Sequence, residues 1–140
     1  MTNLSRRWLV AIICIPIVLV LLYSGNWILG VPLSALAAMG TQEVYRLAAH
    51  TGVDPFRFTG ATGAAALVLA GTWQGTFVAF APWALSIVGT VMLISLILAV
   101  SNRGATGGPL GAVSVTMAGC LYCGFSLSFV PLTLMFPAAE

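Results

Sequence analysis

Charged side chains are scarce in this sequence of 140 residues, because acidic and basic residues together make up only 6% of it. A soluble domain carries roughly 25% charged residues, so this chain has too few charges to cover a surface that faces water. Hydrophobic residues make up 60% of the chain, and the mean hydropathy is +1.07. These values predict an all-α integral membrane protein whose exterior lies mostly against lipid.

Lysine is absent altogether, and the basic residues are five arginines. The net charge of +2 is too small for a nucleic-acid surface, which needs clustered basic side chains. Histidine and cysteine are also few, with one histidine and three cysteines. Cys120 and Cys123 have the C-x-x-C spacing, but they fall within an apolar run where free cysteine behaves as a small hydrophobic residue. We therefore predict that this pair serves packing and that the chain holds no metal.

Apolar runs separated by turn signals predict one membrane domain, residues 1–140, with five spans and a cytoplasmic N-terminus. A crossing helix needs about 20 residues. Residues 59–100 contain no charge over 42 positions, which is twice a crossing, so the chain must turn back within them. TWQGT at 72–76 is the favoured turn, and 81–83 is the alternative. The predicted spans cover residues 4–23, 27–47, 56–73, 77–100 and 110–130, the last ending near Pro131.

The arginines support this topology. With the N-terminus in the cytoplasm and five spans, all five arginines fall on the cytoplasmic side, as the positive-inside bias requires. They are Arg6, Arg7, Arg46, Arg57 and Arg103. The pattern predicts a multi-pass protein of the inner (plasma) membrane.

Polar groups concentrate in the stretch GTQEVYRLAAH, residues 40–50. Glu43, Arg46 and His50 are three and four residues apart, so they share one helix face. In one interpretation this is a helix end, where Arg46 reaches the headgroups and pairs with Glu43. In the other, Glu43 lies inside the bilayer and faces the bundle, and Arg46 or Arg57 contacts a lipid phosphate through the two parallel donors of its guanidinium.

Small residues recur at four-residue spacing, which allows helices to approach closely. Gly30, Ser34 and Ala38 follow this spacing in the second span, and Ser114 and Ala118 follow it in the fifth. We expect them to pack inside the bundle, with a homodimer face as the alternative.

A resemblance to a known family lies in the second and fifth spans. QEVYRLA, with Glu43, Tyr45, Arg46 and Leu47, resembles the end of the second helix of the phosphatidate cytidylyltransferase (CDP-diacylglycerol synthase) family. GCLYCGFSLSFVPLTLM, residues 119–135, is similar to a later helix of the same family. The resemblance is to the N-terminal half of that family.

The sequence departs from the family in its catalytic signature. Members carry a serine-proline-lysine-lysine run and paired aspartates that hold magnesium against CTP, whereas this chain has no lysine and a single aspartate, Asp54. The resemblance therefore implies that Mg²⁺ and CTP belong to a catalytic C-terminal half that is absent here. We assign no catalytic residue and no cofactor to this chain, and we expect a fragment that is inactive alone.

The resemblance implies the membrane portion of an enzyme that joins CTP and phosphatidate to give CDP-diacylglycerol and diphosphate in phospholipid biosynthesis. Its partners would be phosphatidate in the membrane and either a second copy or the missing half. The site residues expected are Arg46 and Arg57 for the lipid phosphate and Glu43 as an intramembrane polar group. The alternatives are a non-enzymatic small membrane interaction or scaffold subunit and a transporter subunit.

Overall fold

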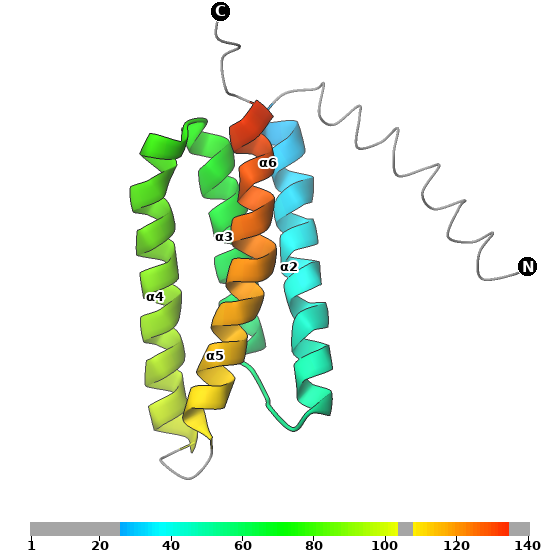
Figure 1. The fold of residues 1–140 in the computed structure, drawn as a ribbon, viewed down its shortest axis with the longest axis vertical. Helices are drawn as coiled ribbons and strands as arrows, with labels where there is room; N and C mark the ends of the chain where they lie inside the picture. Colours follow the sequence, from blue (N-terminus) through cyan, green and yellow to red (C-terminus); the bar gives the residue numbers. More distant parts are fainter. Residues whose placement is uncertain (1–25, 104–107, 135–140) are drawn as a thin grey trace, which may run out of the picture.

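A computed structural model describes residues 26–103 and 108–134, and every regular element among them is helical. The helices form a bundle in which each helix that follows a turn runs antiparallel to the helix before it (Figure 1). The all-helical class that the composition predicted is confirmed. The elements are α2 (Asn26–His50), α3 (Arg57–Gln74), α4 (Phe77–Arg103), α5 (Pro109–Gly119), η1 (Cys120–Phe125) and α6 (Ser126–Leu134).

Four of the five predicted spans coincide with helices, and the span predicted at 4–23 lies outside the described residues. The turn at 72–76 is confirmed, because α3 ends at Gln74 and Gly75 takes a left-handed conformation with φ 63°. Glycine has no Cβ and adopts that conformation without strain. The alternative turn at 81–83 is wrong, since these residues lie inside α4.

The fifth predicted span, residues 110–130, is shorter than the helical run in the structure. Residues 109–134 form one continuous helical run, in which the six-residue π-helix η1 separates α5 from α6. Pro131 is buried inside α6, and the helix continues through it to Leu134. A proline has a backbone φ that suits a helix, and it removes only one backbone donor. The helix therefore continues past Pro131, although the sequence pattern predicted that it would end near this residue.

Two of these helical runs are long and apolar enough to cross a membrane, namely Phe77–Asn102 with a mean hydropathy of 2.4 and Pro109–Leu134 with 1.6. At 26 residues, each reaches about 39 Å, which exceeds a hydrocarbon core of about 30 Å. α2 and α3 are richer in glycine, alanine and threonine. Crossing by these two helices, the number of five spans and the orientation of the N-terminus all stay predictions.

The central helix of the bundle is α3, which packs against α2, α4, α5, η1 and α6. It can do so because its inward face consists of small residues. A Cβ on Gly124 of η1 would collide with Ala64 of α3, and a Cβ on Gly71 would approach the backbone oxygen of Ser128 to 3.0 Å. These positions let the helix axes come close, which is how membrane helices gain packing energy.

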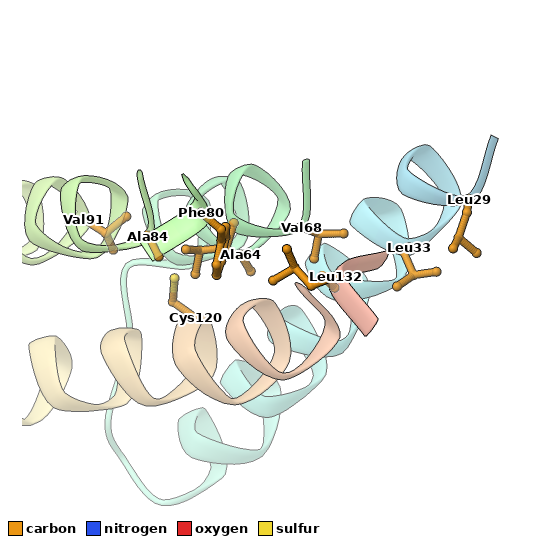
Figure 2. Packing of buried hydrophobic residues seen from close by; sticks show 11 residues of the cluster. Leu29, Leu33, Ala64, Val68, Phe80, Ala84, Val91, Cys120 and Leu132 are labelled. Carbon is orange, nitrogen blue, oxygen red and sulfur yellow. The ribbon is translucent and has the colours of Figure 1, made fainter. Parts of the chain in front are cut away.

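Buried hydrophobic side chains from several helices pack together in one cluster (Figure 2). All described helices except α5 contribute to this cluster. Its members are Leu29, Leu33, Ala37, Ala64, Leu67, Val68, Phe80, Ala84, Val91, Cys120 and Leu132.

We predicted that small residues at four-residue spacing pack inside the bundle, and the result differs between α2 and α5. Gly30 and Ser34 of α2 are buried, and Gly30 lies directly against Thr72 of α3, so internal packing is confirmed there. Ser114 and Ala118 of α5 are exposed, so internal packing is wrong for that pair. The reason is rotational: α5 turns Ala112, Thr116 and Gly119 inward instead.

Candidate functional site

All charged residues of the described segments lie at one end of the bundle. Glu43 and Arg46 fall in the last two turns of α2, Asp54 follows in the loop, Arg57 begins α3, and Arg103 ends α4. These helix ends meet at the lower end of Figure 1. The alternation of helix direction therefore gathers into one layer charges that are up to 60 residues apart in sequence.

The opposite end carries tryptophans and no charge within the described residues. Trp27, Trp73 and Trp83 are exposed near the helix ends there, and the rings of Trp73 and Trp83 lie 6.3 Å apart. Tryptophan favours the boundary between hydrocarbon and headgroups, where the ring is apolar and the indole N–H stays hydrated. The position of these three residues at one end of the bundle fits such a boundary.

A groove of about 440 Å³ runs between α2 and α3 and reaches the charged end. Its volume falls within the roughly 300–1,000 Å³ typical of ligand pockets. Three of its seven lining residues are alanines, so the groove exists in part because two helices in contact carry short side chains at these positions. Its lining residues are Ala38 and Gln42 from α2 and Arg57, Phe58, Ala61, Thr62 and Ala65 from α3.

Of the two arginines expected at a lipid phosphate, Arg57 lines this groove, whereas Arg46 is not among its lining residues. Arg57 lines the groove as the first residue of α3. Arg46 is exposed and lies one helical turn beyond Gln42 on the same face of α2. The antiparallel order of α2 and α3 thus places at one end of the bundle two arginines that are eleven residues apart in the sequence.

The hypothesis that Glu43 faces the bundle is wrong. Its side chain is exposed, and the inward position near this end of α2 belongs to Tyr45, which is fully buried. Residues two apart on a helix point to nearly opposite sides, so burying Tyr45 turns Glu43 outward. No ion pair joins Glu43 to Arg46 among the described residues, so the pairing expected from their spacing is absent as well.

Hydrogen bonds fix the backbone that precedes Arg57. The Tyr45 hydroxyl donates to the carbonyl oxygen of Thr116 at 2.6 Å. The Thr116 hydroxyl accepts from the backbone N–H of Phe56 at 2.9 Å and donates to the carbonyl of Ala112 at 2.7 Å. Thr116 therefore ties α5 both to α2 and to the residue just before Arg57, which sets where the Arg57 side chain leaves the bundle.

Tyr45 fits only because two glycines leave room for its ring. A Cβ on Gly60 of α3 would overlap the Tyr45 hydroxyl, and a Cβ on Gly119 of α5 would overlap the ring edge. Gly119 also accepts a long hydrogen bond of 3.4 Å from the hydroxyl of Thr41. The phenol is thus enclosed by α2, α3 and α5 where η1 begins, and π-helical segments occur often at functional sites.

The two cysteines of the C-x-x-C pair are free and contact different helices. Cys120 is buried, with its sulfur close to Gly63 of α3, whereas the Cys123 sulfur lies near Gly40 of α2. Both thiols fill space beside glycines. This arrangement supports the prediction that they serve packing.

The described residues do not fit a magnesium site. Glu43 and Asp54 are their only carboxylates, and they lie on different segments. Within residues 26–103 and 108–134, no three histidine, cysteine, aspartate or glutamate side chains come together in a way that could hold a metal ion. Magnesium is held by carboxylates together with substrate phosphates, so we derive no step that passes through a metal in this part of the chain.

The fold and the charged end define an all-helical bundle of membrane character, with basic groups at the mouth of an apolar groove. A family model described as the cytidylyltransferase family matches residues 5–138, and the chain belongs to that family, the CDP-diacylglycerol synthase family. The family predicted from the motifs QEVYRLA and GCLYCGFSLSFVPLTLM is therefore confirmed. Comparisons with curated proteins and with solved structures gave no match.

Part of the site gives little signal in the sequence. Gln42 belongs to the motif QEVYRLA, whose pattern predicts no role for it, although it lines the groove together with Arg57. Thr116 was not singled out, because a threonine in an apolar run carries no signal until its partners are known. The spacing of Ala61 and Ala65, four residues apart after Arg57, is the one sequence feature that could have indicated a groove there.

Proposed function

We propose that this chain forms the lipid-binding membrane portion of a phosphatidate cytidylyltransferase. In the proposed reaction, CTP and phosphatidate give CDP-diacylglycerol and diphosphate, as a step of phospholipid biosynthesis. The observation that carries the proposal is the family match over residues 5–138. It is supported by the groove that opens at Arg57, because the lipid substrate of such an enzyme carries a phosphate at the membrane surface.

The proposed role of Arg46 and Arg57 is to hold the phosphate of phosphatidate. Guanidinium groups donate paired, charge-assisted hydrogen bonds to phosphate oxygens. Two of them at one groove mouth would offset the charge of the phosphate and orient the oxygen that must form the new bond to the α-phosphorus of CTP. Both side chains are exposed at the charged end, where a headgroup can reach them.

In this proposal, residues other than the described ones hold CTP and Mg²⁺. When bound, the metal ion would offset the charge that develops on the transferring phosphate groups. The residues of the described bundle would bind the lipid, orient its phosphate and keep its acyl chains in an apolar surrounding. A segment with lysines and paired aspartates, or a partner chain that carries them, would complete the enzyme.

We further propose a multi-pass location in the inner membrane with the charged end in the cytoplasm. Support comes from the two helices long enough to cross a bilayer and from the position of Arg46, Arg57 and Arg103 at one end. CTP is a cytoplasmic nucleotide, so a lipid phosphate held at that end would lie on the side where the nucleotide is available.

The proposal can be tested with the purified chain in phosphatidylcholine nanodiscs. We expect phosphatidate to bind more tightly than added phosphatidylglycerol, and we expect no CDP-diacylglycerol from CTP and Mg²⁺ until a catalytic half of the same family is supplied. Turnover by the chain alone would contradict the division of labour proposed here. Equal binding of all lipids, with no turnover in the completed complex, would favour the alternative of a non-enzymatic membrane subunit.

A further inference from the structure

The groove between α2 and α3 has two chemically different parts. At the charged end, Arg57 and the amide of Gln42 line it, and Arg46 lies one turn beyond Gln42 on the same face of α2. Deeper in the bundle, Ala38, Ala61 and Ala65 form its walls. A polar mouth that carries the Arg57 cation, above a mostly apolar groove, matches the two parts of a phospholipid, which are an anionic headgroup and an acyl chain.

The apolar part extends well below the headgroup level. Arg57 and Ala65 are eight residues apart on α3, which corresponds to about 12 Å along the helix axis. The exposed ring of Phe58, with 83% of its surface accessible, also lines the groove. An inorganic phosphate bound at the mouth would not occupy this apolar part of the groove.

Two other grooves lack the charged mouth. One lies between α3 and α4 and is lined by hydroxyl and apolar groups, among them Thr59, Ser86 and Thr90, and the other lies between α4 and η1 and has only apolar lining residues. Neither has a charged side chain in its lining. Charge complementarity therefore distinguishes the α2–α3 groove as the seat of an anionic lipid.

We propose that the α2–α3 groove seats one acyl chain of the same lipid whose phosphate is held by Arg57 and Arg46, with Ala38, Ala61 and Ala65 setting the width available to that chain. This inference rests on the proposed function, and it assigns the acyl-chain seat and its width-determining residues. In this arrangement the Gln42 amide lies between the phosphate and the chain, at the depth of the glycerol ester carbonyl, to which it can donate a hydrogen bond.

The test compares two neighbouring alanines on α3. Ala65→Leu narrows the α2–α3 groove, while Ala66→Leu makes the same change in the groove between α3 and α4. Both alanines are half-buried, so the two variants impose a similar demand on the fold. Ala38→Leu narrows the same groove from α2 and serves as the second variant, and the unfolding temperature in detergent reports whether each variant folds.

The binding probes are diacyl phosphatidate in phosphatidylcholine nanodiscs and glycerol 3-phosphate, which has the headgroup without acyl chains. We expect Ala65→Leu to weaken phosphatidate binding about tenfold, because several chain methylenes lose their contact with the groove. Glycerol 3-phosphate binding should be unchanged in Ala65→Leu and weakened in Arg57→Gln. A phosphatidate with a photoreactive group in its acyl chain should label α2 and α3 at the groove.

The outcomes separate this inference from the function on which it rests. If Arg57→Gln weakens phosphatidate binding but Ala65→Leu and Ala38→Leu do not, the headgroup contact stands and the acyl-chain seat is overturned. If none of the three variants affects binding, the headgroup contact fails as well. An equal loss in Ala66→Leu, or labelling confined to α4, would also overturn the seat.

Discussion

The Tyr45 hydroxyl of α2 donates a hydrogen bond of 2.6 Å to the carbonyl oxygen of Thr116 in α5, which lies 71 residues further along the chain. The Thr116 hydroxyl in turn accepts from the backbone N–H of Phe56, the residue before Arg57. One buried phenol thus joins the second half of the bundle to the helix start that carries a candidate phosphate ligand. Removing the Tyr45 hydroxyl should therefore affect both the stability of the bundle and the position of Arg57.

Tyr45→Phe should lower the free energy of unfolding by about 1 kcal/mol, since it removes one buried hydrogen bond and keeps the ring. Thermal unfolding in a mild detergent measures the change. Tyr122→Phe is the matched control, because the Tyr122 ring on η1 is 74% exposed and should tolerate the loss of its hydroxyl. Equal melting temperatures for both variants and the parent would show that the Tyr45 bond contributes nothing.

Gly60→Ala should destabilise the bundle by about 1–3 kcal/mol, because its Cβ would overlap the Tyr45 hydroxyl and displace a fully buried ring. Combining it with Tyr45→Phe should recover part of the loss, since the overlapping oxygen is then gone. Gly89→Ala is the control: a Cβ there meets nothing within 4 Å, and alanine favours a helix by up to about 1 kcal/mol over glycine. A Gly60→Ala variant as stable as Gly89→Ala would contradict the packing described.

Arg57→Lys should bind phosphatidate more weakly than the parent and more tightly than Arg57→Gln. Lysine keeps the positive charge but loses the planar pair of donors that matches a phosphate. Binding isotherms in nanodiscs, measured with Arg46→Gln as a second variant and His50→Gln as the control, test this order. His50 is exposed in the last turn of α2, about two helical turns beyond Gln42 and so one turn further from the groove than Arg46, and its replacement should leave binding unchanged.

Introduced cysteines test the sidedness of the bundle. In sealed vesicles of a variant without its native cysteines, Thr51→Cys and Asn102→Cys should react with an impermeant maleimide from the same compartment. Thr76→Cys, in the turn at the opposite end, should react from the other compartment. All three parent residues are exposed. Labelling of positions 51 and 102 from opposite sides would contradict the topology.

The helix boundaries were largely predictable because they depend on local chemistry. Gly75 takes the left-handed conformation that ends α3, and Pro55 precedes the start of that helix at Arg57. The charged end was predictable for a similar reason, since alternating spans of about 20 residues place every second connection on the same side. The end of the last helix was not predictable in this way. Pro131 lies inside the helix, where the remaining backbone hydrogen bonds and the packing keep the helix continuous.

The candidate site was only partly predictable. Arg46 and Arg57 stand out in the sequence because charges are rare in an apolar chain, and the structure places both at the charged end, with Arg57 in the lining of the groove. The orientation of Glu43 stayed open between two interpretations, because the sequence does not tell which face of α2 turns inward. In a soluble helix the polar face would decide this, but a helix in lipid is apolar on both its buried and its exposed sides.

By itself, the sequence determined that this protein is helical, that its surface suits lipid and that its described charges collect at one end, since composition and span length depend on the chain alone. Only the tertiary structure decided the rotation of each helix, and with it the burial of Tyr45, the outward turn of Glu43 and the groove beside Arg57. The physical reason is that these rotations are set by where Gly60, Gly119 and Gly124 allow another helix to approach. Such contacts exist only once the helices have packed together.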